Sequence, residues 1–454
     1  MKIASVFIAN RGEIACRINR ACRALDVKVI QAYSAADADS LAVRLADEAV
    51  LIGDPPAAKS YLDIQKVVAA AVDSGADAVH PGYGFLAENA DFAQAVTDAG
   101  LIFIGPDAES ISRLGDKVSA REVAAAAGVP TVPGSAGRIE AIEAAREVVQ
   151  RTGYPLMIKA AAGGGGRGIR IVGSDAEFEE QFPQAAREAA SAFGDGGLYL
   201  EKVIEQARHV EVQILGDGER FIHCFERECS LQRRRQKVWE EAPAVGLPAA
   251  TRKKMCESAV ALAAAVKYRG AGTVEYLYDE ATDEFHFIEV NTRIQVEHPI
   301  TEMITGIDLV REMICIAGGE PLSIAQTDVT PRGHAIECRI NAEDPEKNFM
   351  PWPGTIESMQ VPDRDGVRFD TMLYEGYTVP PFYDSLLGKL IVYADDRDAC
   401  LARLREALAQ LVIEGLPTTV SLHQKLADDD AVANGQFHTR FLEPWLEQAY
   451  ATTS

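Results

Sequence analysis

The chain has 454 residues, of which 47% are hydrophobic and 25% are charged, and its formal net charge is −23 at pH 7. The length predicts two to four domains, and the composition is typical of a soluble globular protein. The acidic balance argues against a nucleic-acid partner, because affinity for nucleic acid depends on surplus lysine and arginine.

The sequence shows no sign of secretion or of insertion into a membrane. Residues 1–10 form a short apolar run that meets a polar turn, and no apolar run is long enough to cross a bilayer. The eight cysteines form no C-x-x-C pair and no cluster with zinc spacing. We therefore expect a cytoplasmic protein with reduced thiols and no membrane partner.

Residues 1–115 alternate between strand and helix patterns, which predicts a doubly wound parallel sheet. We expect strands at 4–9, 27–33, 76–80 and 101–104, and helices at 12–25, 64–72 and 89–99. The first turn lacks G-x-G-x-x-G, so dinucleotide binding is not expected. Residues 80–86 follow a predicted parallel strand, where ligands of open sheets bind; the alternative is a tight turn with core aromatics.

The middle of the chain begins with predicted helices at 107–115 and 116–128. A compact insert follows, with helices at 139–151 and 175–191 and strands at 154–160, 169–172 and 198–204. Further strands are expected at 210–215, 221–226, 272–278 and 285–290, with a long helix at 251–268. The last part should contain helices at 308–317, 399–411 and 419–426, strands at 335–341 and 389–393, and a frayed end over the last eight residues.

A glycine run, residues 163–168, joins two predicted strands of the insert. It lacks the G-K-[ST] of a P-loop, and a glycine cluster alone is often only a hairpin tip. Lys159 precedes the run and Arg167 lies within it, and glycine amides can approach phosphate oxygens closely. The segment therefore suits a mobile flap that covers a nucleoside triphosphate.

Residues 229–243 contain the densest positive patch of this acidic chain. Charge runs are usually solvated faces, and that is the default interpretation for Arg233 and Arg234. Cations flanked by polar amides and followed by Glu240 and Glu241 also suit a site for phosphate and a second anion.

The most informative stretch is residues 285–299, which we interpret as one extended strand. Alternation places five polar side chains on one side of this strand, over about 26 Å: Glu289, Asn291, Arg293, Gln295 and Glu297. Ile288, Val290, Ile294 and Val296 fall on the other side. Carboxylates with an amide oxygen suit Mg²⁺, an arginine fork suits an anion, and the last glutamate is then free to act as a base. The alternative is a half-buried strand with a solvated face.

Several long motifs occur in a fixed order, and together they resemble the biotin carboxylase family of the ATP-grasp superfamily. They are residues 8–15, 80–86, 115–117, 163–168, 232–238, 289–299 and 337–344. The resemblance spans about residues 3–446 and implies an α/β and α+β ATP-grasp fold. The implied domains are an N-terminal doubly wound parallel-sheet domain (1–115), an ATP-grasp domain (116–330) with a mobile lid at about 131–204, a C-terminal domain (331–446) and a tail (447–454).

The resemblance implies ATP- and bicarbonate-dependent carboxylation of a carrier-bound biotin through carboxyphosphate, with Mg²⁺ or Mn²⁺. The implied ATP-binding residues are Lys117, Lys159, Gly164, Gly165, Gly166, Glu201, Lys202, Val203, Ile204, His209, Gln232, Glu275, Glu289 and His438. The implied metal ligands are Glu275, Glu289 and Asn291. Bicarbonate would be held by Lys237, Arg293, Gln295, Val296 and Glu297, and biotin by Tyr83 and Arg339. The implied catalytic residues are Arg293, Glu297, Lys237 and Arg339.

The implied partners are a biotin carboxyl carrier protein or domain and a carboxyltransferase subunit, because the chain has no Met-Lys-Met biotinyl site. The resemblance also implies a homodimer, but Ala24 and Asp365 depart from the bacterial interface pattern near Arg20. Arg235 stands where many members have histidine or another residue that is not arginine, and Trp239 where a smaller aliphatic residue is usual. Two rival functions are another ATP-grasp ligase that joins an acyl phosphate to an amine, and a non-catalytic nucleotide-binding subunit.

Overall fold

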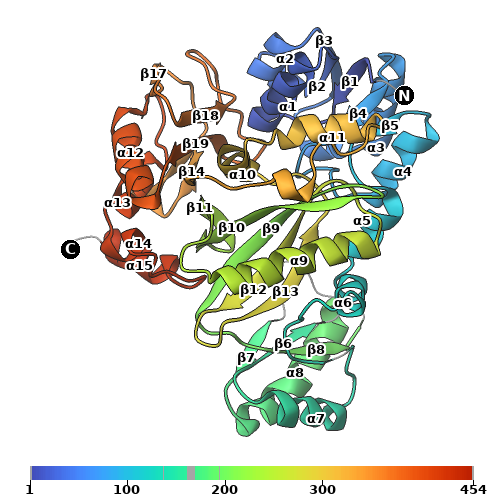
Figure 1. Ribbon diagram of the computed structural model, residues 1–454, viewed down its shortest axis with the longest axis vertical. Helices are drawn as coiled ribbons and strands as arrows, with labels where there is room; N and C mark the ends of the chain where they lie inside the picture. Colours follow the sequence, from blue (N-terminus) through green and yellow to red (C-terminus); the bar gives the residue numbers. More distant parts are fainter. Residues whose placement is uncertain (1–2, 136, 161–168, 194, 452–454) are drawn as a thin grey trace.

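The computed structural model describes residues 3–135, 137–160, 169–193 and 195–451. Figure 1 shows three lobes: the N-terminal part at the top, the insert at the bottom and the C-terminal part at the left. The predicted glycine loop, with Gly164, Gly165 and Gly166, lies outside the described residues. None of the described helices is long and apolar enough to span a membrane.

The N-terminal part is a parallel five-stranded sheet in the order β3-β2-β1-β4-β5. Its strands are β1 (Ser5–Ile8), β2 (Lys28–Ser34), β3 (Glu48–Gly53), β4 (Ala78–His80) and β5 (Ile102–Phe103). Its helices are α1 (Gly12–Ala24), α2 (Leu41–Leu45), α3 (Ile64–Asp73) and α4 (Ala90–Asp98). Val6 and Ile8 join one apolar core and Phe7 joins another, so both faces of the sheet are covered. The predicted doubly wound sheet is confirmed, although β3 was not predicted.

The order of this sheet reverses between β1 and β4, and the loops that follow these two strands meet at its carboxyl edge. The Asn10 side-chain amide donates to the carbonyls of Pro81 and Tyr83, at 2.6 and 2.7 Å. Such a reversal leaves a crevice that commonly takes a ligand. The structure therefore brings residues 80–86 to a candidate ligand site.

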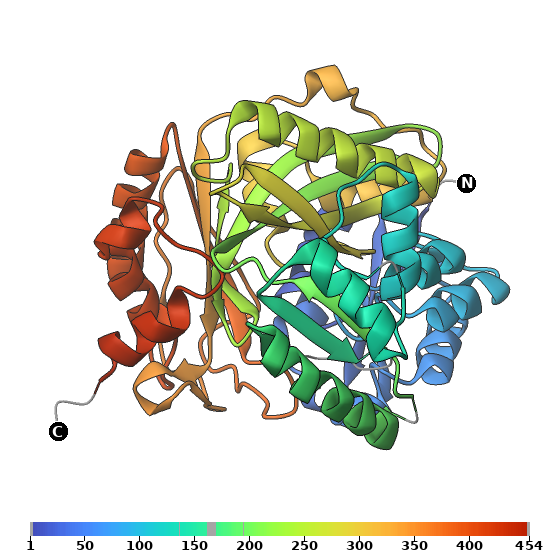
Figure 2. The same cartoon turned by 90° about the horizontal axis from the view of Figure 1, so that it is seen from below.

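Helices α5 (Ala108–Gly115) and α6 (Lys117–Ala126) lead out of the N-terminal part, and Asp107 and Asp116 cap them. The insert then forms a three-stranded sheet, β7-β6-β8, with helices α7 and α8. These elements are β6 (Leu156–Ala160), β7 (Arg170–Val172), β8 (Leu198–Lys202), α7 (Ile142–Thr152) and α8 (Asp175–Phe193). Side chains such as Ile158, Phe178 and Leu200 give the insert its own core. From below, it lies in front of the central sheet (Figure 2).

An eight-stranded antiparallel sheet runs through the centre of the molecule, in the order β13-β12-β9-β10-β11-β14-β19-β18. Its strands are β9 (Ala207–Asp217), β10 (Phe221–Arg233), β11 (Gln236–Ala242), β12 (Arg269–Asp279), β13 (Glu284–Asn291), β14 (His334–Asn341), β18 (Val367–Thr371) and β19 (Leu386–Ala394). Since β11 pairs with β14, the sheet is continuous across residue 330, where we expect a domain boundary. The division into domains stays a prediction.

The remaining elements of the second half of the chain are helices and short strands. They are α9 (Ala249–Ala265), α10 (His298–Thr305), α11 (Leu309–Ala317), α12 (Arg397–Gln410), α13 (Val420–Ala427), α14 (Asp430–Ala433), α15 (Leu442–Ala449), β15 (Glu343–Asp344), β16 (Met350–Pro351), β17 (Met359–Gln360) and β20 (Val412–Ile413). The predicted frayed end is wrong for residues 447–449, because α15 continues through them and buries Leu446.

The predicted single strand over residues 285–299 is wrong beyond Asn291, where β13 ends. The chain turns, and α10 begins at His298 with Glu297 as its N-cap and a proline in its first turn. The five polar side chains therefore do not form a straight row. They instead converge, because the turn brings Gln295 and Glu297 back towards β12 and β11.

Candidate active site

A cavity of about 550 Å³ lies where the loops after β1 and β4 face the central sheet. It is lined by Asn10, Arg11, Gly12, Glu13, Tyr83, Gly84, Phe85, His209, Gln232, Arg235, Gln236, Lys237, Glu275, Glu289, Asn291, Arg293, Gln295, Val296, Arg339, Asn341, Tyr383, Asp384 and Leu386. Most of the predicted anion, metal and biotin residues are in this lining, although they come from distant parts of the sequence.

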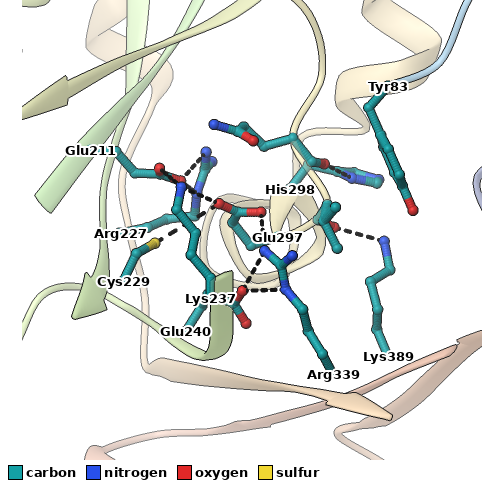
Figure 3. Close-up of polar contacts among 12 residues, drawn as sticks. Tyr83, Glu211, Arg227, Cys229, Lys237, Glu240, Glu297, His298, Arg339 and Lys389 are labelled. Carbon is teal, nitrogen blue, oxygen red and sulfur yellow. Dashed lines mark hydrogen bonds and ion pairs between the residues drawn. The ribbon is translucent and has the colours of Figure 1, made fainter. Parts of the chain in front are cut away.

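Lys237, on β11, is the centre of the charge arrangement (Figure 3). Its ammonium group lies 2.5 Å from Glu211, 2.9 Å from Glu275 and 2.7 Å from Glu297. Burial opposes the positive charge, but the three carboxylates raise the pKa of Lys237 well above its ordinary value. The lysine therefore stays protonated and can hold an anion.

Glu297 is fully buried at the start of α10 and faces two cations. Lys237 lies 2.7 Å from one of its oxygens and Arg339 lies 2.9 Å from the other, and the Cys229 thiol is 3.9 Å away. Burial would raise the pKa of Glu297, but Lys237, Arg339 and Arg227 hold it well below its ordinary value. The carboxylate is thus ionised.

Arg339 reaches the cavity from β14 and is held by two carboxylates. Its guanidinium donates to Glu240 at 2.6 Å and to Glu297 at 2.9 Å. Burial opposes its charge, but Glu240 and Glu297 raise the pKa of Arg339 further above its ordinary value. This fixed cation lines the same cavity as Tyr83.

Arg293 also lines the cavity that Lys237 lines. Its guanidinium donates to the side-chain oxygens of Asn291 at 3.0 Å and Gln295 at 2.9 Å, and to Glu88 at 2.8 Å. Its side chain is only 18% exposed, so it is not in bulk solvent. The predicted convergence of Arg293 and Glu297 with Lys237 is therefore present.

The predicted metal ligands lie together on the β12–β13 pair. Glu275 and Glu289 are directly opposite each other, and the Asn291 amide donates to Glu275 at 2.8 Å. Burial raises the pKa of Glu289, and the charge of Glu275 adds to the effect. Two facing carboxylates are hard oxygen donors, and a divalent cation would relieve their repulsion, so Glu275 and Glu289 fit Mg²⁺ or Mn²⁺. The Asn291 side-chain oxygen accepts from Arg293, and its nitrogen faces Glu275.

A second acidic group that could hold a metal ion consists of His209, Glu211 and Glu275. His209 Nε2 lies 3.1 Å from Glu275, and Gln232 lies 2.9 Å from the other ring nitrogen. Burial would lower the pKa of His209, but Glu275 raises it above its ordinary value. A raised pKa favours the protonated ring, which can donate to an anion but cannot ligate a metal through that nitrogen.

The other predicted ATP-binding residues that the structure describes do not line this cavity. Lys159 pairs with Glu201 across the β6–β8 ladder, and Lys202 donates to the Tyr154 carbonyl at 2.5 Å. Val203 is buried after β8, Ile204 is half-buried next to it, and Lys117 is exposed at the start of α6. His438 is half-buried in a loop whose next residue bonds the Ala207 carbonyl, at the start of β9.

The basic segment 229–243 forms a hairpin of β10 and β11. Arg234 and Arg235 form its two-residue tip, and both have positive φ (48° and 66°), which is uncommon for residues with a side chain. Arg235 lines the cavity, while Arg233 stacks on Phe349. Trp239 does not reach the cavity, because it is buried in the C-terminal core and donates to Glu241 at 3.0 Å.

Glu211 and Arg227 were not predicted as site residues, although both are fully buried beside Lys237. Arg227 donates to Glu211, Gln213 and Thr301, at 2.7, 2.7 and 3.0 Å, and so fixes the carboxylate that faces Lys237. The signal in the sequence was weak but present: Glu211 and Gln213 alternate with Val210, Val212 and Ile214 on one strand.

Comparisons with known proteins agree with this geometry. Residues 2–111 match the model of the biotin carboxylase N-terminal domain, 116–325 the ATP-binding domain of carbamoyl-phosphate synthase L chain, and 337–444 the biotin carboxylase C-terminal domain.

The chain is 52% identical over 443 residues to biotin carboxylase of Pseudomonas aeruginosa, covering 97% of this chain and 98% of that protein. Biotin carboxylase of Campylobacter jejuni, solved as a β,γ-ATP complex, superposes with a TM-score of 0.91 at 44% identity, covering 98% and 99%. The biotin carboxylase domain dimer of Hydrogenobacter thermophilus 2-oxoglutarate carboxylase, with MgADP, ADP and bicarbonate, has a TM-score of 0.90 at 45% identity, covering 98% of each chain.

Proposed function

This chain belongs to the biotin carboxylase family, and from that premise we propose how its residues carry out the ATP- and bicarbonate-dependent carboxylation of biotin. This reaction is the first half-reaction of biotin-dependent carboxylases. The observation that carries the assignment of roles is the buried junction at which Lys237 and Arg339 both contact Glu297.

Lys237 and Arg293 bind the bicarbonate anion in this proposal, with the Gln295 amide and the Val296 backbone beside them. Support comes from the common cavity that the four residues line and from the raised pKa of Lys237, which is caused by the carboxylates around it against the effect of burial. The global charge of −23 disfavours anions, so local cations must supply the attraction. Arg293 presents a planar fork that matches the shape of bicarbonate.

Glu297 takes the proton of bicarbonate on one of its carboxylate oxygens, which makes the anion a better nucleophile towards the terminal phosphate of ATP. The low pKa caused by Lys237, Arg339 and Arg227 keeps Glu297 ionised, and that is the form that a base requires. The attack yields carboxyphosphate and ADP, and carboxyphosphate then gives CO₂ and phosphate.

Arg339 stabilises the negative charge that develops on the ureido oxygen when phosphate removes the proton from the biotin nitrogen. The nitrogen of the resulting enolate-like ureido anion then attacks CO₂. Arg339 is suited to this role because Glu240 and Glu297 fix its guanidinium before the ligand arrives, so little reorganisation is needed. Tyr83 lines the same cavity and is proposed to contact the biotin ring.

Glu275, Glu289 and Asn291 would hold Mg²⁺ or Mn²⁺, which neutralises phosphate charge and orients the terminal phosphoryl group. Lys117, Lys159, His209 and Gln232 would contact the nucleotide phosphates or ribose, with Glu201 to Ile204 beside the adenine and His438 near the ribose. The insert of residues 131–204 would act as the lid.

As a family member, the chain is a biotin carboxylase subunit or domain of a carboxylase complex. We further propose that a biotin carboxyl carrier protein and a carboxyltransferase are its partners and that it works in the cytoplasm. A homodimer is proposed from the related dimer, although Arg20 pairs with Asp370 of its own chain at 2.5 Å. Ala24 and Asp365, the two positions that depart from the bacterial interface, are both exposed.

The direct test measures the transfer of labelled carbon from bicarbonate to biotin. The purified protein is incubated with ¹⁴C-bicarbonate, MgATP and free biotin, and acid-labile label on biotin is trapped and counted. Labelled biotin that requires ATP supports the proposal. ADP release that depends on an amine and not on biotin would support the rival ligase, and ATP binding without turnover would support a non-catalytic subunit.

A further inference from the structure

The buried lysine Lys389 is not used by the mechanism above, although it lies beside the proposed base. It is on β19, directly opposite Arg339 in the β14–β19 ladder, and its side chain is 0% exposed. A buried lysine is rare without compensating partners, so its contacts indicate its role.

The Lys389 ammonium group makes direct contacts to two different parts of the molecule, and its charge also acts on the buried Glu337. Its ammonium group donates to the backbone carbonyl of Val296 at 2.7 Å and lies 3.0 Å from the carboxylate of Glu13. Val296 precedes Glu297 in the chain, and Figure 3 shows Lys389 pointing at the turn before α10. The lysine therefore ties the backbone next to the proposed base to the N-terminal part.

Glu13 continues this connection to the proposed biotin pocket. It lies in the first turn of α1, is 3% exposed, and the Tyr83 hydroxyl donates to the same oxygen that faces Lys389. Burial raises the pKa of Tyr83 well above its ordinary value and Glu13 adds to this, so the phenol remains a donor. Two buried groups, Glu13 and Lys389, thus link Tyr83 to the turn that carries Glu297.

The turn is held from a second side as well. His298 Nδ1 lies 2.8 Å from the Gln295 carbonyl, and burial lowers the pKa of His298 well below its ordinary value, so the ring is neutral. The neutral imidazole can donate only one hydrogen bond, and His298 acts within its own segment. Lys389 therefore adds a backbone contact that ties the turn to β19 and, through Glu13, to α1, beside the side-chain contacts of Glu297 with Lys237 and Arg339.

We infer that Lys389 and Glu13 are a positioning pair that sets the proposed base Glu297 and the proposed biotin-pocket residue Tyr83 in one geometry. This inference rests on the proposed function and deepens it. A buried ion pair contributes little net stability compared with apolar residues of similar size. The contribution of this pair is instead to hold Glu297 and Tyr83 in position, because a displacement of about 1 Å at a reacting group can cost about 100-fold in rate.

The test compares Lys389→Met with the double variant Glu13→Gln/Lys389→Met. In Lys389→Met, a buried carboxylate loses its cation, so we expect a lower melting temperature, a kcat lower by about 10- to 100-fold and a higher KM for biotin. The double variant removes both charges, so the melting temperature should largely recover while kcat and KM for biotin stay impaired. KM for ATP should change little in both, since neither residue faces the predicted nucleotide ligands.

Arg397→Met is the matched control, because Arg397 also pairs with a buried carboxylate, Glu241 at 2.7 Å, but lies outside the cavity. It should lower the melting temperature without changing kcat or KM for biotin. If the double variant regains full activity together with its stability, or if Lys389→Met has wild-type kinetics, the pair is only structural and the inference is overturned. If the wild type itself does not carboxylate biotin, the proposed function fails instead, so the two failures are distinguishable.

Discussion

The ammonium group of Lys237 lies 2.7 Å from the carboxylate of Glu297, which is fully buried. The lysine comes from the β10–β11 hairpin and the glutamate from the turn before α10, so this ion pair joins two segments about sixty residues apart. The proposed anion-binding cation and the proposed base are therefore in direct contact. This preorganisation lowers the reorganisation needed for reaction, and it makes the roles of single residues testable.

Glu297→Gln should abolish turnover while leaving nucleotide affinity unchanged. The substitution keeps the shape of the side chain but removes the proton acceptor, and a loss of about 100- to 10,000-fold in kcat is expected. Steady-state ADP release measures turnover, and calorimetric titration with nucleotide measures affinity. Glu241→Gln, a buried glutamate outside the cavity, is the control that should keep kcat. Lost nucleotide affinity in Glu297→Gln would contradict the assigned role.

Arg339→Met should lower kcat/KM for biotin by at least about 100-fold, because the charge that stabilises the ureido oxygen is lost. The KM for ATP should be much less affected, since Arg339 does not contact the predicted nucleotide residues. The measurement is biotin-dependent ATP cleavage over a range of biotin concentrations. Biotin stimulation equal to that of the wild type would show that Arg339 does not face the ureido group.

Glu289→Gln should raise the Mg²⁺ concentration required for half-maximal velocity by about 10- to 100-fold. Glu289 faces Glu275 across the β12–β13 ladder, and one of the two carboxylates that would share the cation is then neutral. Glu284→Gln, on the same strand but exposed, is the control that should leave the requirement unchanged. An unchanged requirement in Glu289→Gln would remove this residue from the ligand set, and a chelator should stop turnover in every variant.

Glu337→Gln should stabilise the protein more at pH 8 than at pH 5. Burial raises the pKa of Glu337 well above its ordinary value; the charge of Lys389 opposes this shift and that of the facing Glu240 adds to it. Burial also raises the pKa of Glu240, to about 7. Because the folded state holds protons that the unfolded state has released, the contribution of this pair to stability falls as pH rises above about 4.3.

Glutamine carries no titrating proton, so Glu337→Gln removes part of the decrease in stability that occurs as pH rises. The measurement is thermal unfolding of variant and wild type from pH 5 to pH 8. The difference between their melting temperatures should grow with pH. The exposed Glu357→Gln variant should show a constant difference. A constant difference for Glu337→Gln as well would mean that Glu337 is ionised throughout this range.

The regular elements could be predicted because their patterns are local. The helix predicted at 12–25 is observed as Gly12–Ala24, since its apolar positions repeat at helical spacing and face one core. Strand β3 was missed because it lies at the sheet edge, and only Ile52 of its side chains is buried, so it lacks the pattern of a central strand.

The candidate site was predicted from motifs, but its geometry was not. Alternation correctly placed Glu289 and Asn291 on one face of β13, but it could not show that the chain turns after Asn291. The proline at 299, next to the first residue of α10, was an available signal for that turn. Lys389 and Glu13 could not be predicted, because each is a single charged residue whose partner lies hundreds of positions away.

The most direct measurement of the central claim is bicarbonate-dependent ATP cleavage by the wild-type protein with and without biotin. Because Lys237, Arg339 and Glu297 meet in one cavity, we predict slow cleavage with bicarbonate alone and a clear increase when free biotin or a biotinylated carrier is added. A rate that does not rise with biotin, in protein that binds nucleotide normally, would contradict the account.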